Sequence, residues 1–220
     1  MKHLAKVALI VFLLLVGALG VSAADFDRMQ NVLLQRFGAP AIGSFRDWQK
    51  LLREAAAQPA PAQLGQVNNF FNRRIRFRDD QEVWSQSDYW ATPMETLGKG
   101  AGDCEDFAIA KYFTLLLLNV PDEKLRLIYV QARLGGVNSS ITQAHMVLAY
   151  YPAPDAEPVI LDNLINDLQP ASRRPDLQPV FSFNRQGLWK GASGARGAGV
   201  PSSLSRWEEL LKRAGAEGFD

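Results

Sequence analysis

The sequence predicts an α+β fold, because segments with helical spacing come first and antiparallel strands follow. Up to about residue 118, apolar residues recur at helical spacing and the segments end at Gly or Pro. From about residue 125, short runs rich in Val, Ile, Leu and Tyr alternate with turns. One helix, from Cys104 to Leu118, is apolar on nearly every side, which predicts that it is buried against the sheet. This order is not that of a doubly wound α/β sheet.

Three helices are predicted in the N-terminal part of the chain. The first runs from Asp25 to Phe37 and ends at Gly38, a residue type that commonly closes helices. The second is expected to open at Ser44, with Asp47 at the capping-box position. The third is expected from about Ala62 to Arg74, after a Pro-rich break.

A basic group follows the third helix and could suggest a site for a polyanion. It consists of Arg73, Arg74, Arg76 and Arg78, and acidic residues follow it at once: Asp79, Asp80 and Glu82. Because opposite charges alternate over so short a stretch, a solvated face with salt bridges is the favoured interpretation.

The second half of the chain reads as strands joined by turns. The predicted strands are Leu125 to Leu134, Ala144 to Tyr151, Val159 to Asp162, and a last hairpin made by Val180 to Phe183 and Leu188-Trp189. Gly- and Pro-containing stretches separate them, so antiparallel pairing is expected.

The N-terminus has the pattern of a secretory signal peptide. Lys2 and Lys6 form a basic region, Val7 to Leu19 is apolar, and Ser22-Ala23-Ala24 is a small-residue cleavage site. We expect cleavage before Asp25 and export, with an uncleaved anchor as the alternative. Without the two lysines, 22 of the 24 basic residues remain against 23 acidic ones, so the charge is −1 and a nucleic-acid partner is not expected.

The C-terminal stretch is predicted to lie outside the main domain. Gly191 to Pro201 is rich in Gly, Ala and Ser and reads as a flexible linker, and Ser205 to Glu208 reads as the capping box of a terminal helix. That helix could pack back on the domain, contact a partner or fray. The predicted organisation is a signal peptide (1–24), one domain (25–190), and a linker with a helix (191–220).

Cys104 occupies the start of the apolar helix, after Gly100-Ala101-Gly102 and a capping Asp103. Free backbone N–H groups and the positive end of the helix dipole surround that position. Such an environment lowers the pKa of a thiol and favours a nucleophile. The chain has one cysteine, so the thiol is either inert and buried or active.

His145 is the only histidine beyond the signal peptide, and Asp162 follows 17 residues later on the next predicted strand. Neighbouring antiparallel strands can place the imidazole beside the carboxylate, and the packed helix can bring Cys104 against His145. A cysteine nucleophile needs this set of groups: thiolate, imidazole, and a carboxylate that fixes the imidazole tautomer. The competing interpretation is a core cysteine, a locally satisfied histidine and a turn-forming aspartate.

Three carboxylates adjoin the thiol, on Asp103, Glu105 and Asp106. Negative charge disfavours a thiolate, and a bound cation would offset it. Clustered oxygen ligands suit calcium, although three residues cannot supply the roughly 6–8 ligands that calcium takes. The alternative is a capping box between Asp103 and Asp106, with Glu105 complementing the helix dipole; spacing alone leaves the two even.

An oxyanion site would use the backbone N–H of Cys104. Trp90, in the loop before the helix, is a candidate for the second donor, and a role in the core or the wall of a cleft is an equal alternative.

Three motifs together resemble one family. They are Gly102-Asp103-Cys104-Glu105-Asp106-Phe107-Ala108, Ala144-His145-Met146-Val147-Leu148 and Leu161-Asp162-Asn163. They are similar to the motifs of the bacterial transglutaminase-like cysteine proteinases, and within that family to those of the LapG-type periplasmic adhesin proteases. The resemblance implies a papain-like transglutaminase core, a catalytic triad of Cys104, His145 and Asp162, and calcium dependence through Asp103, Glu105 and Asp106.

The same resemblance implies substrate and partners. The substrate would be a large repeat-containing surface adhesin, cut after a pair of alanines in its N-terminal region to release it and disperse a biofilm. The regulator would be an inner-membrane cyclic-di-GMP receptor that holds the protease in the periplasm. Two alternatives use the same scaffold: acyl transfer to an amine, and a binding module without activity.

Overall fold

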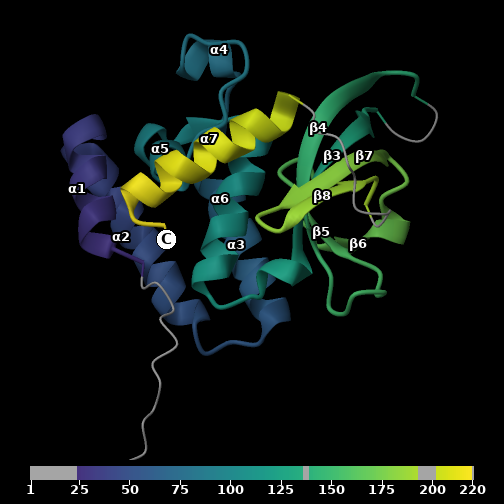
Figure 1. The fold of residues 1–220 in the computed structure, drawn as a ribbon, viewed down its shortest axis with the longest axis horizontal. Helices are drawn as coiled ribbons and strands as arrows, with labels where there is room; N and C mark the ends of the chain where they lie inside the picture. The colour runs from purple at the N-terminus through teal and green to yellow at the C-terminus, as the bar shows by residue number, and fades with distance from the viewer. Residues whose placement is uncertain (1–23, 136–138, 193–201, 220) are drawn as a thin grey trace, which may run out of the picture.

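The computed structural model describes residues 24–135, 139–192 and 202–219. Its α-helices are α1 (Phe26–Phe37), α2 (Ala39–Ala55), α3 (Ala60–Arg74), α4 (Asp80–Val83), α5 (Pro93–Lys99), α6 (Cys104–Leu117) and α7 (Ser202–Glu217). Figure 1 shows the helices gathered on one side and the main sheet on the other, with α6 between them. The predicted signal peptide and most of the predicted linker lie outside the described residues. No helix among the described residues is long and apolar enough to cross a membrane.

Helix α6 is the centre of the core. Ten of its residues, from Asp106 to Leu115, are buried, as the apolar pattern predicts. It packs on α3 and α5 on one side and on strand β4 on the other. Burial on all sides fixes the position of its N-terminal end, where Cys104 lies.

Two sheets are present in the described residues. A small parallel pair joins β1 (Arg76–Phe77) to β2 (Ala101–Gly102). The main sheet is antiparallel, in the order β6-β5-β4-β3-β7-β8. Its strands are β3 (Leu125–Arg133), β4 (Thr142–Tyr150), β5 (Val159–Leu161), β6 (Gln169–Pro170), β7 (Leu177–Asn184) and β8 (Gly187–Lys190). The predicted antiparallel strands and the last hairpin are confirmed.

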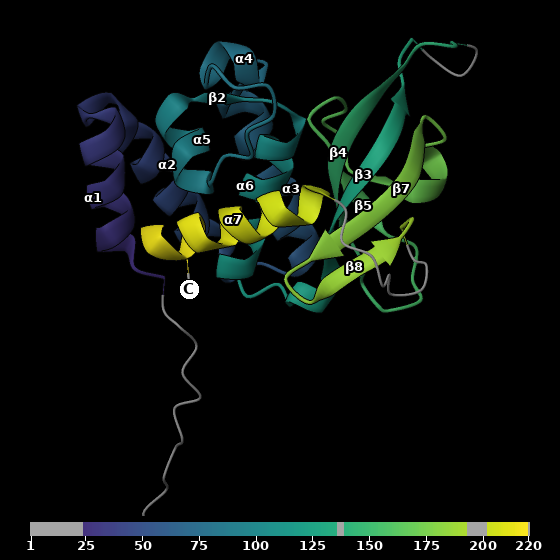
Figure 2. The ribbon, with the colours of Figure 1, turned by 45° about the horizontal axis from the view of Figure 1, so that its top comes forward.

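Helix α7 packs back on the domain, which is one of the three roles left open for it. Figures 1 and 2 both show it lying across the helical side. Trp207, Leu210 and Ala214 are buried in the common core. The N–H of Asp25 donates to the carbonyl of Gly218 (3.1 Å), so the two ends of the described chain meet.

The start of one predicted helix is wrong, and helix α5 is missing from the prediction. Helix α2 begins at Ala39 and not at Ser44, because Pro40 occupies its first turn, where proline is well tolerated. Ser44 lies inside the helix and accepts a hydrogen bond from Arg74. Helix α5 was not predicted, although Thr92 and Glu95 form a capping box around Pro93.

Candidate active site

Two glycines shape the turn that places Cys104 at the start of α6. Gly100 closes α5 in the left-handed region (φ 61°), which favours glycine. A Cβ atom on Gly102 would lie 2.4 Å from Oδ2 of Asp106, so only glycine allows that close approach. Asp103 is the N-cap of α6, and its N–H donates to Asp106 (3.4 Å). The capping box between Asp103 and Asp106 is therefore present, and it leaves Oδ1 of Asp103 without a hydrogen-bond partner.

The Cys104 thiol lies against carboxylates and a strand. Its Sγ donates to Oε2 of Glu105 (3.0 Å), and the backbone N–H of Met146 donates to Sγ. Burial raises the pKa of this thiol, and the neighbouring Glu105 and Asp103 raise it further. The prediction that the helix start lowers the pKa is therefore wrong for the chain alone, because desolvation and adjacent negative charge outweigh the dipole.

His145 and Asp162 form a buried pair. Nε2 of His145 lies 2.7 Å from Oδ1 of Asp162, and both side chains are at most 1% exposed. Nδ1 of His145 is buried and has no hydrogen-bond partner. The strands bring the two together because Leu161, at the end of β5, pairs with Leu148 of β4. The ring thus has one nitrogen engaged and one left for a group in the cleft.

Arg174 is a third member of this cluster, and no sequence motif indicates it. Its Nη2 donates to Oδ2 of Asp162 (2.7 Å) and to Asp176 (2.8 Å), and the side chain is 2% exposed. Burial alone would raise the pKa of Asp162. Hydrogen bonds from His145, from the Leu164 N–H and from Arg174 outweigh burial and lower the pKa to about 2. The carboxylate is held charged.

Cys104 and His145 both line a cleft with a volume of about 950 Å³. It lies beside the part of β4 that β5 does not reach, since β5 pairs only with Leu148 to Tyr150. Aromatic and aliphatic side chains line much of it, among them Phe77, Trp90, Tyr129, Leu164 and Phe181. The cleft therefore combines apolar walls with polar groups, as binding sites commonly do.

The acidic cluster beside Cys104 is larger than the sequence predicted. Carboxylate oxygens of Asp80, Asp103 and Asp106 lie within 4.8 Å of one another, and so do those of Asp80, Asp88 and Glu105. Asp80 was assigned to a solvated salt-bridged face, but it is 3% exposed. The reason is the β1–β2 pair, in which the N–H of Arg78 donates to the carbonyl of Gly102 (3.0 Å) and so places the residues after β1 beside Asp103.

The cluster fits a hard cation. Oδ1 of Asp80 and Oδ1 of Asp103 are buried and have no hydrogen-bond partner. Burial, with Glu105 beside them, raises the pKa of Asp80 to about 6 and that of Asp103 to about 10. Both oxygens of Asp106 already accept N–H groups, from Ala91 and from Asp103. Uncompensated carboxylates with free oxygens are what a calcium site requires.

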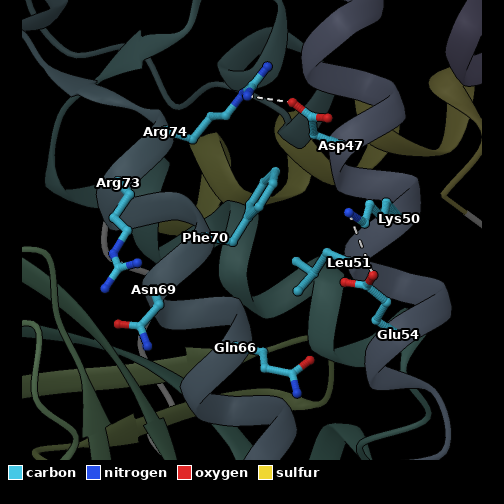
Figure 3. A pocket seen from close by; sticks show the side chains of 9 residues that line it. All are labelled: Asp47, Lys50, Leu51, Glu54, Gln66, Asn69, Phe70, Arg73 and Arg74. Atoms are coloured by element: carbon cyan, nitrogen blue, oxygen red, sulfur yellow. Dashed lines mark ion pairs between the residues drawn. The ribbon is translucent and has the colours of Figure 1, made fainter.

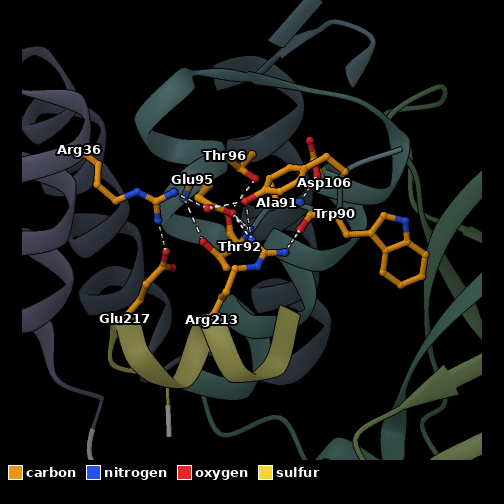
Figure 4. Close-up of polar contacts among 10 residues, drawn as sticks. Arg36, Trp90, Ala91, Thr92, Glu95, Thr96, Asp106, Arg213 and Glu217 are labelled. Carbon is orange, nitrogen blue, oxygen red and sulfur yellow. Dashed lines mark hydrogen bonds and ion pairs between the residues drawn. The ribbon is translucent and has the colours of Figure 1, made fainter. Parts of the chain in front are cut away.

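Trp90 lines the cleft and stacks on Phe183, with ring centroids 5.6 Å apart. The contacts of its segment are drawn in Figure 4, where the indole points away from the polar network toward the sheet. The cleft-wall interpretation is confirmed, and a role as oxyanion donor stays a prediction.

A second hollow lies away from this cleft, between α2 and α3 (Figure 3). The predicted basic group contributes Arg73 and Arg74 to it. Arg74 pairs with Asp47 (2.5 Å), and Arg78 pairs with Glu82 (3.2 Å). Both ion pairs support the salt-bridged interpretation of the basic group.

Comparisons with known proteins agree with this geometry. The family described as bacterial transglutaminase-like cysteine proteinase BTLCP matches residues 48–175. No curated protein matches the chain. The solved structure of Legionella pneumophila LapG is 40% identical, covers 86% of this chain and 97% of its own, and has a TM-score of 0.71.

Two further LapG structures from Legionella pneumophila, also 40% identical over 86% of this chain, are similar. The EGTA-treated form has a TM-score of 0.72 and is covered to 97%, and the calcium-bound form has a TM-score of 0.70 and is covered to 98%. The family match and the helix-on-sheet fold agree. The chain therefore belongs to the bacterial transglutaminase-like cysteine proteinases.

Proposed function

We propose that the protein is a calcium-dependent cysteine endopeptidase whose catalytic triad is Cys104, His145 and Asp162. The observation that carries the proposal is that the thiol and a buried His145–Asp162 pair line one cleft, with Nδ1 of the imidazole unpartnered. A cysteine nucleophile needs a base that can take its proton and a third group, here a carboxylate, that orients the base.

Each residue then has a distinct task. Nδ1 of His145 takes the thiol proton, and the Cys104 sulfur attacks the peptide carbonyl. The imidazolium returns the proton to the leaving amine, and water releases the acyl group from the sulfur. Asp162, held by Arg174, accepts the Nε2–H and stabilises the imidazolium. The N–H of Cys104, and the indole of Trp90, would donate to the developing oxyanion.

Calcium would be held by Asp103, Glu105 and Asp106, and also by Asp80 and Asp88, whose carboxylates lie in the same cluster. Its positive charge would lower the pKa of the adjacent thiol, which the cluster alone raises. The buried unpartnered oxygens of Asp80 and Asp103 support this assignment, and one relative, LapG, has a calcium-bound structure.

The proposed substrate and setting rest on the family resemblance of the three sequence motifs. The substrate would be a large repeat-containing surface adhesin, cut at a di-alanine site in its N-terminal region to release it and promote biofilm dispersal. An inner-membrane cyclic-di-GMP receptor would regulate the enzyme. The protein would act in the periplasm after export by a cleaved signal peptide, with no nucleic-acid partner.

The test uses residues 25–220 and the Cys104→Ala variant with the N-terminal fragment of a repeat adhesin from the same genome. Mass spectrometry should show two fragments with the parent protein in calcium, and none with Cys104→Ala. Chelator should stop cleavage, and calcium but not magnesium should restore it. Cleavage by Cys104→Ala would refute the triad, and heavier products in place of fragments would favour acyl transfer to an amine.

A further inference from the structure

The segment from Tyr89 to Thr92 lies between the C-terminal helix and the acidic cluster. Figure 4 shows Arg213 of α7 reaching this segment from one side and Asp106 of α6 meeting it from the other. The segment has no regular secondary structure until α5 begins at Pro93. Its conformation therefore depends on the side chains that bind its backbone.

One peptide unit joins the two sides. Nη2 of Arg213 donates to the carbonyl of Trp90 (2.6 Å), and the N–H of Ala91 donates to Oδ1 of Asp106 (2.8 Å). That carbonyl and that N–H belong to the same planar peptide group, so neither can turn without the other. The guanidinium thus fixes the direction of a hydrogen bond that orients a carboxylate of the cluster.

Tyr89 provides a second connection. Its N–H donates to Oδ2 of Asp80, which leaves Oδ1 of Asp80 as the free oxygen. Its hydroxyl accepts from Nη1 of Arg213 (2.9 Å) and donates to Glu95 (2.8 Å), and the guanidinium lies 4.7 Å from the ring centroid. Arg213 therefore contacts Tyr89, whose N–H binds Asp80. It also contacts the Trp90–Ala91 peptide, whose N–H binds Asp106.

Arg213 is itself held rigidly. Its Nη1 lies 2.5 Å from Oε2 of Glu95, a fully buried carboxylate. Arg36 of α1 binds the other oxygen of Glu95 (2.5 Å) and also binds Glu217 of α7 (2.8 Å). Charge-assisted contacts of this kind are the strong class of hydrogen bonds. The network connects α1, α5 and α7 behind the acidic cluster.

We propose that Arg213 is a positioning residue for the cation site, acting through the Trp90–Ala91 peptide and Tyr89. The C-terminal helix is then part of the machinery that sets calcium affinity, although it supplies no ligand. The proposal rests on the calcium dependence in the proposed function. It extends that function to residues about a hundred positions from the motif around Cys104.

Calcium affinity of the full mature chain, measured by titration calorimetry, tests the proposal. Arg213→Gln should weaken binding by about tenfold, the scale expected when a hydrogen bond to a charged group is lost. Arg213→Lys, which keeps the charge but not the fork, should fall between Arg213→Gln and the parent. Lys212→Gln is the matched control, because Lys212 is the exposed neighbour on the same helix and its replacement removes the same charge.

Hydrogen exchange in chelator gives a readout that needs no calcium. The Ala91 amide should exchange faster in Arg213→Gln than in Lys212→Gln. A melting curve in chelator shows whether Arg213→Gln is folded, and Arg213→Lys carries the comparison if it is not. Affinity in Arg213→Gln within twofold of the parent would overturn the proposal, whatever the Ala91 exchange, and leave the proposed function intact. A parent that binds no calcium would overturn both.

Discussion

Replacement of Asp162 by Asn should remove a defined pH dependence from the stability of the protein. The pKa of Asp162 is about 2 in the folded protein, against an ordinary value of 3.8. The unfolded chain therefore binds a proton more readily than the folded one between these values. The stabilisation is complete above about pH 4 and is lost as the pH falls through 2.

The size of the effect follows from the difference of about 1.8 between the two pKa values. At 1.36 kcal/mol for each pH unit, Asp162 contributes about 2 kcal/mol at neutral pH, and about half of this is lost by pH 3. The side chain is fully buried, so solvent screening is small.

Urea unfolding of the parent and of Asp162→Asn, both in chelator, measures this quantity at pH 6 and pH 3. The acidic cluster is the same in both proteins, so its titration cancels in the difference. The stability gap between them should narrow by about 1 kcal/mol over this range. A gap that stays constant or widens on acidification would refute the assigned ion pairs of Asp162.

Three further predictions follow. Without calcium, burial raises the pKa values of Asp80 and Asp103, so the folded protein holds protons that the unfolded chain releases. The folded state therefore loses stability as the pH rises, and the melting temperature in chelator should fall between pH 5 and pH 8. Calcium should abolish that fall, and a melting temperature that rises instead would contradict the cluster. Arg174→Met should cost about 3–5 kcal/mol in urea unfolding, since it leaves Oδ2 of the buried Asp162 without its ion-pair partner while His145 still binds Oδ1. A loss below 1 kcal/mol would contradict this. Trp90→Phe keeps the ring but not the indole N–H, so kcat should fall about 100-fold at constant KM if Trp90 completes the oxyanion site; an unchanged kcat would remove it from that role.

The sequence predicts the helix that begins at Cys104 and the strands around His145 and Asp162 well, because their signals are local. The apolar run after Cys104 can only be a buried helix, and the alternating strand around His145 can only pair with its neighbours. The sequence does not predict Asp80 and Asp88 as members of the cluster, because a two-residue pairing of β1 with β2 brings them to Asp103. Acidic residues beside arginines are usually solvated.

The same limit applies to the cationic side chains around the site. Arg174 lies 12 residues after Asp162, and Arg213 lies 123 residues after Trp90 in the C-terminal helix. Nothing in the local sequence pattern around either arginine indicates the group that it binds. Their roles come from tertiary contacts with a carboxylate and with a backbone carbonyl. The predicted lowering of the Cys104 thiol pKa is wrong for a related reason. The helix dipole is a local property, whereas the burial of the thiol and the orientation of the Glu105 side chain depend on the rest of the fold.

The pH profile of Cys104 alkylation by iodoacetamide tests the central claim most directly. In calcium, alkylation should continue well below pH 8, and it should weaken in His145→Ala, because the imidazole takes the thiol proton. In chelator, the reaction should need a higher pH, since burial and Glu105 then raise the thiol pKa. A profile that follows an ordinary thiol titration near pH 8.5, unchanged by calcium and by His145→Ala, would contradict the account.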